Sequence, residues 1–409
     1  MTAPAPTMIP VFTEPDEFRS LVRAWFDEHA PTKGGQDDFS NVHVVSASSI
    51  EEYDAREHAA LETTRAWQRK RYDAGLAGRS WPLEYGGLGA PAWQDDVIDA
   101  EQARYGVSTK MLAIALDMAP PVLSAYGTHE LRAAHLPRIV RGDESWCQLL
   151  SEPDAGSDLT SVTTTASAVD GGWAVSGQKV WTSGAGTASF ALLIARTNRD
   201  IPGRGGLSCF VLDMSQPGVT VRPLRQISGA YHFNEVFLDD VFVPDGALIG
   251  ELGGGWTVLR TMLASERASI GGGTSVRGAI PLMAMVQKLG INDDPVVRQD
   301  VVSAIARERL LDLVQARIAA TGAVPAAGSV AKLLYTEHGR LTSDVALRLI
   351  GAAGMISDDE LSEPWIDRFL FAPGLRIGGG TDEIQRTTIA ERGLGLPREP
   401  AAEPATFGA

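Results

Sequence analysis

The sequence predicts an α+β protein of several domains, in which a β region separates two helical regions. Apolar residues recur at helical spacing over residues 15–145, alternate with period two over residues 146–250, and return to helical spacing over residues 251–395. At 409 residues the chain is long enough for two to three domains. We therefore predict three domains with these bounds, flanked by loose tails at residues 1–14 and 396–409.

Two apolar runs carry the prediction of an N-terminal helical domain. The first comprises Phe18, Leu21, Val22 and Trp25, and the second comprises Leu112, Ala115, Leu116 and Met118. Both repeat every three or four residues, which places their members on one face of a helix.

The β region is marked by a hairpin signal. Asp170-Gly171-Gly172 stands between Thr163–Val169 and Trp173–Val175, and a Gly-rich pair between two alternating runs favours a tight turn. Further strands are predicted at Ala188–Arg196, Ser208–Leu212 and Asn234–Val243.

Helical spacing returns after Gly253-Gly254-Gly255, and one long helix there carries an apolar stripe. The stripe comprises Val302, Ile305, Leu310, Leu313, Val314 and Ile318. Such a stripe indicates either the core of a helical bundle or an interface between subunits.

Composition excludes several classes of protein. The net charge of −15 argues against nucleic acid or an anionic membrane as partner. No apolar run approaches the roughly 18 residues that a membrane-spanning helix needs. Two cysteines, Cys147 and Cys209, provide neither a disulfide framework nor a zinc site, and the histidines lack metal-ligand spacing. We expect a cytoplasmic protein without a metal.

Four segments stand out for their chemistry. Trp146–Asp158 reads as a strand that ends in a loop whose Gly156 and Ser157 can offer N–H groups and a hydroxyl to a polar ligand, although an ordinary turn has the same composition. The other three segments are Gln178–Ser183, Ser265-Glu266-Arg267 and Gly379–Arg386.

These segments occur in the order and at the spacing found in the acyl-CoA dehydrogenase family of flavoproteins, which the chain resembles from about Phe18 to Pro397. The resemblance implies a helical N-terminal domain, a β-barrel-like middle domain and a C-terminal four-helix bundle. It also implies FAD as cofactor, an acyl-CoA substrate, an electron-transfer flavoprotein as acceptor, and a tetramer or dimer that is active in lipid metabolism.

The catalytic base departs from the commonest pattern of that family. Abstraction of the weakly acidic α-proton requires a carboxylate in a water-poor site, because burial raises its pKa. Most of the family carries this Glu in a Tyr-Glu-Gly-Thr segment, and the matching position here is Gly379. A minority, resembling isovaleryl-CoA and long-chain acyl-CoA dehydrogenases, carries it on the long helix, where this chain has Glu266. We therefore predict that Glu266 is the base and that Gly378 and Gly379 leave it room.

Flavin-binding positions follow from the same resemblance. It implies that the segment Trp146–Asp158 contacts the flavin through Gln148, Leu150, Ser151, Gly156 and Ser157. It also implies flavin contacts from the two later segments, through Trp181, Ser183, Thr381 and Glu383. Thr381 also stands where a helix cap is expected, and free N–H groups at a helix start favour anionic atoms.

Substrate and subunit contacts are less complete. The resemblance implies that Arg267 helps to hold CoA, with Ser157 and Gly379 beside the substrate, but Ala264 replaces an Asp that often assists. At the adenine end of the flavin, Lys288–Asn292 lacks the family's Arg and Phe-Gly, whereas Arg348 and Gly351 remain as candidates.

Two alternatives stay open. The chain could be a partner subunit of a mixed tetramer with an incomplete site, which the altered Lys288–Asn292 segment favours. It could also be a flavin oxidase or monooxygenase of the same fold.

Overall fold

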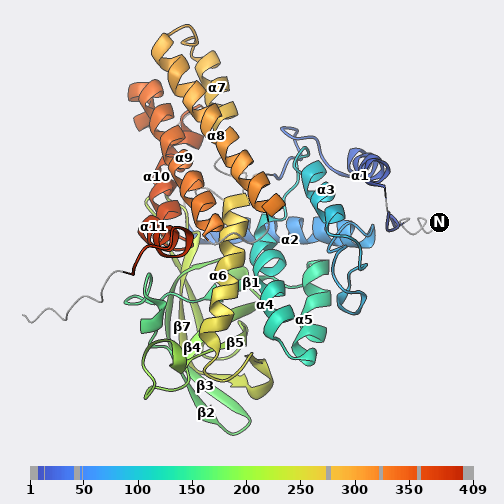
Figure 1. Ribbon diagram of the computed structural model, residues 1–409, viewed down its shortest axis with the longest axis vertical. Helices are drawn as coiled ribbons and strands as arrows, with labels where there is room; N and C mark the ends of the chain where they lie inside the picture. Colours follow the sequence, from blue (N-terminus) through green and yellow to red (C-terminus); the bar gives the residue numbers. More distant parts are fainter. Residues whose placement is uncertain are drawn as a thin grey trace, which may run out of the picture. The chain divides into compact units, whose positions relative to one another are not determined.

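The computed structural model describes residues 8–12, 14–40, 47, 49–272, 278–321, 326–356 and 361–398. These residues form two compact units, which divide between Ser265 and Glu266. Unit 1 holds the first helices and the sheet, and unit 2 holds the C-terminal helices (Figure 1).

The α-helices that begin in unit 1 are α1 (Pro15–His29), α2 (Ile50–Asp73), α3 (Trp93–Gln102), α4 (Ala119–Tyr126), α5 (His129–Arg141) and α6 (Gly255–Gly272). Local chemistry sets several of their ends. The Ser49 hydroxyl accepts the Glu52 N–H at 3.2 Å at the start of α2, and Gly142 ends α5 in the left-handed conformation, with φ +85°. The helix predicted from Phe18, Val22 and their neighbours is confirmed as α1, in which Phe18 and Val22 are buried.

The second predicted run is helical but not α-helical. Residues Lys110–Leu112 form a 3-10 turn and Ile114–Met118 form a π-helical turn that leads into α4. Pro120 and Pro121 explain the change, because they lack the N–H groups that the carbonyls of Leu116 and Asp117 would accept in an α-helix.

The strands of unit 1 belong to a single described sheet. They are β1 (Trp146–Leu149), β2 (Thr165–Val169), β3 (Gly172–Ser183), β4 (Phe190–Arg196), β5 (Leu207–Asp213), β6 (Val219–Leu224), β7 (Phe233–Pro244) and β8 (Leu248–Ile249).

The order of the strands in this sheet is β6-β7-β3-β2-β4-β5-β8, and β1 pairs in parallel with β4. The predicted hairpin is confirmed as the antiparallel β2–β3 pair, with Gly171 at φ +72° in the turn. Leu192, Leu193 and Phe210, on β4 and β5, lie at the centre of a core that also takes in residues of α4 and the first half of α6.

Unit 2 contains the remaining helices of the described chain: α7 (Ala279–Lys288), α8 (Pro295–Thr321), α9 (Ala327–Ile350), α10 (Glu363–Ile377) and α11 (Asp382–Thr388). α9 packs against α8 and α10, while α7 packs against α8 and α9, so the four longer helices form a bundle. The predicted fold class is confirmed: a helical N-terminal region, a β region and a C-terminal helical bundle.

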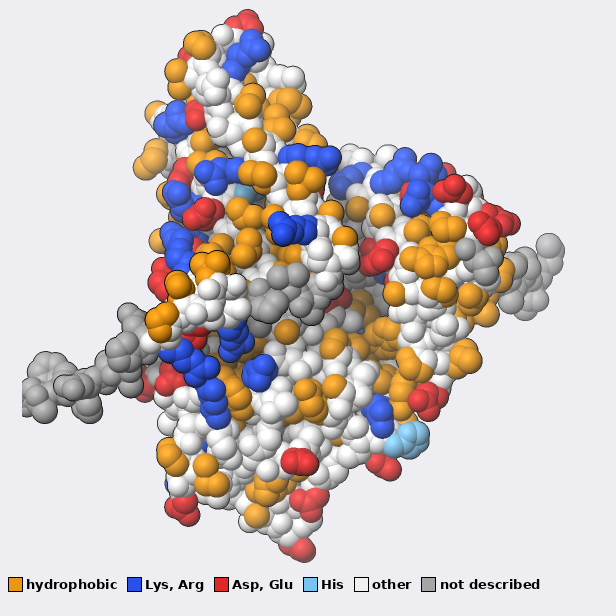
Figure 2. Space-filling model, viewed as in Figure 1, with side chains coloured by type: hydrophobic (Ala, Val, Ile, Leu, Met, Phe, Trp, Pro, Cys, Tyr) orange, Lys and Arg blue, Asp and Glu red, His pale blue; other side chains and the backbone are white. Residues whose placement is uncertain are grey.

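The stripe predicted on α8 does not lie in the core of this bundle. α8 buries Val297, Val301, Ala304 and Leu311, whereas Val302, Ile305, Leu310 and Leu313 are 58%, 44%, 53% and 52% exposed. Apolar side chains are spread widely over the surface of this unit (Figure 2). Of the two predicted roles for the stripe, the bundle core is therefore wrong for these four residues.

Candidate active site

A buried ion pair between Lys179 and Glu152 holds the loop that follows β1. Lys179 Nζ lies 2.9 Å from Glu152 Oε1 and donates to the Leu150 carbonyl at 2.9 Å. Glu152 Oε1 also accepts the Thr164 N–H, and its Oε2 accepts the Thr163 N–H at 2.7 Å. Burial raises the pKa of Glu152, but the Lys179 ammonium and the Thr hydrogen bonds outweigh it and lower the pKa to about 2. Glu152 is therefore ionised and fully hydrogen-bonded.

The same contacts bring the two predicted flavin segments of unit 1 together. Lys179 lies on β3, and its neighbour Val180 donates its N–H to the Ser151 carbonyl at 2.9 Å. The end of β1 and the middle of β3 are thus joined directly, although they are separated by about 30 residues of chain. Gln148 on β1 reaches the Met118 sulfur at 3.2 Å, and Leu150 is buried.

The loop is held by hydrogen bonds on both sides of an exposed pair of residues, Gly156 and Ser157. Glu152 and Ala155 exchange two backbone hydrogen bonds, and the Asp158 carboxylate accepts the Thr160 N–H at 3.0 Å. Between these fixed points Gly156 and Ser157 are exposed, and a Cβ added at Gly156 would meet no atom within 4 Å. Gly156 and the Ser157 side chain therefore border open space.

Trp181 combines a strained backbone with an uncovered indole. It lies at an irregularity in the β3–β7 pairing between Lys179 and Thr182, and its φ of +62° is in the left-handed region. Its side chain is 61% exposed and touches the Phe233 ring only edge-on, at 6.1 Å between centroids. Strain of this kind is found at functional sites, where the surrounding structure holds it in place. Two residues on, Ser183 is half-buried at the end of β3.

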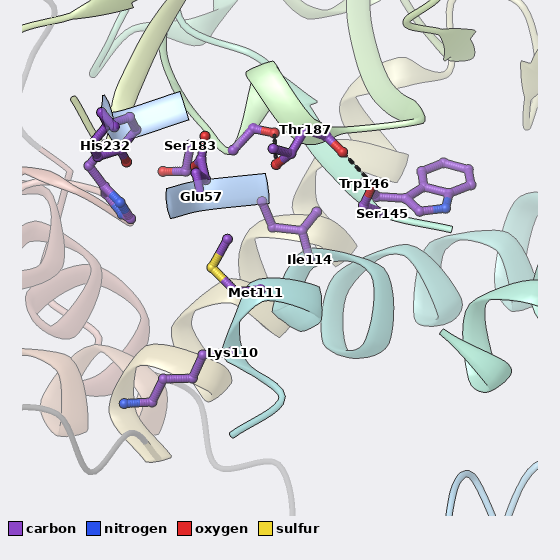
Figure 3. A pocket seen from close by; sticks show the side chains of 11 residues that line it. Glu57, Lys110, Met111, Ile114, Ser145, Trp146, Ser183, Thr187 and His232 are labelled. Carbon is purple, nitrogen blue, oxygen red and sulfur yellow. Dashed lines mark hydrogen bonds between the residues drawn. The ribbon is translucent and has the colours of Figure 1, made fainter. Parts of the chain in front are cut away.

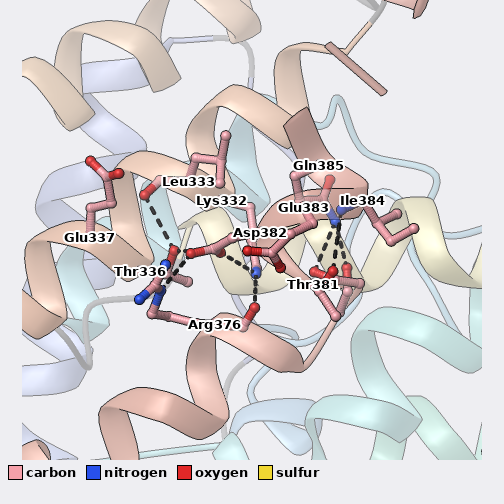
Figure 4. Close-up of polar contacts among 12 residues, drawn as sticks. Lys332, Leu333, Thr336, Glu337, Arg376, Thr381, Asp382, Glu383, Ile384 and Gln385 are labelled. Carbon is pink, nitrogen blue, oxygen red and sulfur yellow. Dashed lines mark hydrogen bonds and ion pairs between the residues drawn. The ribbon is translucent and has the colours of Figure 1, made fainter. Parts of the chain in front are cut away.

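A second buried ion pair fixes the C-terminal loop of unit 2 (Figure 4). Lys332 Nζ on α9 lies 2.9 Å from Asp382 Oδ1, and the side chains are 0% and 1% exposed. The Thr336 hydroxyl donates to Oδ1 at 3.1 Å and the Arg376 guanidinium donates to Oδ2 at 2.7 Å. Burial raises the pKa of Asp382, but the hydrogen bonds from Arg376 and Lys332 outweigh it and lower the pKa.

The loop itself, Gly378–Thr381, is shaped by glycine and a helix cap. Gly379 and Gly380 adopt φ values of +66° and +86°, and the Gln385 amide donates to the Gly379 carbonyl at 2.8 Å. Thr381 caps α11 by accepting the Ile384 N–H at 3.2 Å. Glu383, also in the first turn of α11, is 76% exposed.

The remaining predicted residues are dispersed. Arg348 pairs with Asp300 at 2.6 Å near the end of α9, where Gly351 follows with φ +66°. Sixteen residues of helix, about 24 Å, separate Arg348 from Lys332 and the loop that Lys332 anchors. Arg348 therefore does not join Thr381 within one chain.

Glu266 lies on α6 and is half-buried. It follows the buried Val258, Leu259 and Met262 by eight, seven and four residues, which places it on the same face of the helix. The side chain of Arg267 lies outside the described part of the structure, so its contact with CoA stays a prediction.

Sequence reasoning missed a pocket in unit 1. α2, the turn before α4 and the ends of β1 and β3 line an open pocket of about 80 Å³ (Figure 3). Its lining includes Ser183 and a buried carboxyl group, Glu57, from α2. Glu57 sits among charged residues in the sequence and reads there as a solvated residue. Only its i−4 and i+4 neighbours Tyr53 and Leu61, both apolar, hint at a buried face.

Comparison with known proteins decides the family. The acyl-CoA dehydrogenase N-terminal, middle and C-terminal domain models match residues 37–143, 147–241 and 253–394. The acyl-CoA dehydrogenase IpdE1 of Mycolicibacterium smegmatis is 35% identical over 401 residues, which cover 94% of this chain and 99% of that protein. The chain belongs to the acyl-CoA dehydrogenase family.

Solved members of the family share the fold over nearly the whole chain. The Tcur3481-Tcur3483 steroid ACAD has a TM-score of 0.77 at 26% identity and covers 95% of this chain and 99% of its own. The ChsE4-ChsE5 complex from Mycobacterium tuberculosis has a TM-score of 0.75 at 25% identity and covers 96% and 100%. The predicted family membership and enzyme class are thereby confirmed, and this acyl-CoA dehydrogenase family member is an oxidoreductase. None of the helices in the described ranges combines the length and apolarity that crossing a membrane requires.

Proposed function

We propose that this chain is an FAD-dependent acyl-CoA dehydrogenase that oxidises the Cα–Cβ bond of an acyl thioester, with Glu266 as the base. The observation that carries the proposal is that one chain has both a half-buried carboxylate on α6 and glycines at 378–380, where most of the family carries its Glu. A helix-borne carboxylate needs such a small facing loop to reach the substrate.

The residues of unit 1 fit a flavin. A planar ring needs an aromatic surface that the protein leaves uncovered, and Trp181 offers one. The polar edge of the ring needs fixed donors, and the ion-paired loop offers the N–H groups around Gly156 and Ser157 without further ordering. When bound, FAD supplies the acceptor for the β-hydride, which no side chain can take.

The protein's own part is to bind, orient and remove a proton. Glu266 takes the α-proton as the general base. The candidates for contact with the thioester are Ser157 in unit 1 and the backbone of Gly379 in unit 2. Similarity to proteins described as steroid acyl-CoA dehydrogenases supports a ring-bearing acyl group. An electron-transfer flavoprotein then reoxidises the enzyme.

Glu266→Gln tests the proposal. The variant keeps the size of the side chain and removes its basicity, so we expect bound flavin to remain while reduction by an acyl-CoA, seen as bleaching of the visible flavin band, falls at least 10³-fold. Glu251→Gln, an exposed position just before α6, is the matched control and should bleach like the wild type. Full activity of Glu266→Gln would exclude Glu266 as the base.

A second candidate function is that of a subunit in a mixed oligomer. The exposed apolar stripe on α8 offers a subunit interface, and two similar solved structures are described as pairs of different chains, Tcur3481-Tcur3483 and ChsE4-ChsE5. The Lys288–Asn292 segment, which lacks the residues implied for the adenine end of the flavin, also favours a partner that completes the site.

The native mass and the flavin content of the protein separate the two cases. A homotetramer with one FAD per chain, formed by this chain alone, would support a self-sufficient enzyme. A colourless protein that gains flavin only when it is produced with a homologous chain would support the mixed oligomer.

A further inference from the structure

The pocket in unit 1 is built from elements that meet at the end of β3 (Figure 3). α2 docks on this part of the sheet through the Tyr53 ring, 5.6 Å from that of Tyr231, and through Arg65, which donates to the Ser145 hydroxyl at 3.0 Å. The residues that line the pocket are Tyr53, Glu57, Lys110, Met111, Ile114, Ser145, Trp146, Ser183, Gly184, Thr187 and His232. Its volume of about 80 Å³ suits one small group of a ligand rather than a whole ligand.

Glu57 is the unusual member of this lining. Its residue is 7% exposed, and Oε2 lies 3.7 Å from the position that a Cβ on Gly186 would occupy. Within the described residues, no hydrogen bond or ion pair reaches its carboxyl group. Because Glu57 lines the pocket and no described residue bonds to its carboxyl group, that group is available to a ligand in the pocket.

The charged and titratable groups near Glu57 come from several elements. Asp54 and His58 lie on α2 itself, while Lys110 and His232 reach the pocket from other segments. Burial is the main effect, followed by the Asp54 carboxylate, and together they raise the pKa of Glu57 to about 7. Near neutral pH the group can therefore accept a hydrogen bond as carboxylate or donate one as acid.

The rest of the lining defines the ligand. Met111, Ile114 and Trp146 make much of the wall apolar, and the carboxyl group of Glu57 is its acidic member. A neutral, largely apolar group that carries one hydroxyl fits both features, because the hydroxyl can pair with Glu57 while its carbon skeleton meets the apolar wall.

We propose that this pocket is a specificity site for a hydroxyl group on the acyl part of the substrate, and that Glu57 binds that hydroxyl. The inference rests on the proposed function for the identity of the ligand as an acyl-CoA. The link between them is Ser183, which lines the pocket and lies two residues after Trp181 on the strand that the flavin is expected to contact.

Binding of matched thioesters tests this role independently of turnover. The probes are 3-cyclohexylpropanoyl-CoA and its isomers hydroxylated at ring position 2, 3 or 4, and isothermal calorimetry of the flavin-containing protein gives each Kd. We expect at least one hydroxylated isomer to bind the wild type about tenfold more tightly than the parent compound, as a hydrogen bond to a buried carboxyl group allows.

Three variants test whether Glu57 causes the preference for the hydroxylated isomer. Glu57→Leu should abolish it while the Kd of the parent compound changes less than about threefold, and Glu57→Gln, which keeps an acceptor oxygen, should retain part of it. Asp73→Asn, an exposed carboxylate at the end of the same helix, should behave like the wild type. Flavin content and circular dichroism show whether Glu57→Leu has folded. If it has not, the preference is measured in Glu57→Gln, where it should be reduced.

Two results would overturn the inference: no hydroxylated isomer is preferred by the wild type, or the preference survives in Glu57→Leu. Failure of the proposed function has a different signature, because the wild type would then bind these thioesters without bleaching of its flavin.

Discussion

Lys179 and Glu152 form an ion pair at 2.9 Å with side chains that are 0% and 4% exposed, and this pair supports the loop that carries Gly156 and Ser157. Removing one partner would leave the other charge buried and unpaired.

Glu152→Gln should therefore cost about 3–5 kcal/mol of the free energy of unfolding. It should also weaken flavin binding, because the loop donors lose their fixed positions. Thermal unfolding and flavin titration measure the two effects. Asp344→Asn, which breaks the exposed α9 pair with Arg340, is the control and should cost less than about 1 kcal/mol.

The same pair sets a response to acid. The pKa of Glu152 falls from its ordinary 4.5 to about 2 in the folded protein, so the unfolded chain binds a proton first as the pH drops. Its stabilising contribution is complete above pH 4.5 and is lost as the pH falls from 4.5 through 2. Unfolding measured from pH 6 to pH 2 should show a shallower loss of stability over that window in Glu152→Gln, and identical slopes would contradict this account.

In unit 2, Asp382→Asn should release the Gly378–Thr381 loop. The buried Lys332 ammonium loses its counter-charge, and the first turn of α11 loses its anchor to α9. Hydrogen exchange should accelerate at least tenfold for amides of that turn. Arg376→Gln touches the same carboxylate from a side chain that is 38% exposed and should have a smaller effect. Equal effects would show that burial of the lysine is not the cause.

A substitution at Trp181 should weaken flavin binding while changing the stability of the protein little. Trp181→Gly relieves a left-handed backbone strain of about 1–2 kcal/mol. Two losses oppose this gain: glycine has greater freedom in the unfolded chain, and the few contacts of the exposed indole disappear. We expect the flavin-free protein to unfold within about 1 kcal/mol of the wild type, while flavin affinity falls about tenfold through lost stacking. Trp181→Phe keeps an aromatic ring and should retain most of that affinity.

The stripe on α8 predicts an oligomer. Leu310→Lys places a charge at a side chain that is 53% exposed in the single chain, so it should leave the fold intact and reduce the native mass. Ser167→Lys, at an exposed position of β2 in unit 1, is the control. An unchanged native mass for Leu310→Lys would locate the interface elsewhere.

The sequence predicted those parts of the fold that depend on neighbours along the chain. The spacing of Phe18 and Val22 gave α1, and Asp170-Gly171 gave the β2–β3 turn, because periodicity and turn chemistry act locally. β6 was missed: it is a short edge strand that pairs only with β7 and contains Pro223.

The candidate site was harder to predict because its supports are distant in the chain. Lys179 and Glu152 are 27 residues apart and Lys332 and Asp382 are 50 apart, and nothing local to either residue reveals its partner. Glu57 was missed for the same reason, since only the docking of α2 on the sheet turns a charged helix position into a buried one.

The burial of Lys179 and Lys332 also bears on self-modification. Acyl thioesters are acyl donors, and a lysine amine that can reach one competes as a nucleophile. Both side chains are 0% exposed, and each Nζ donates hydrogen bonds to a carboxylate and to a backbone carbonyl. The two lysines that anchor the loops of the candidate site are thus shielded from acylation by the enzyme's own class of substrate.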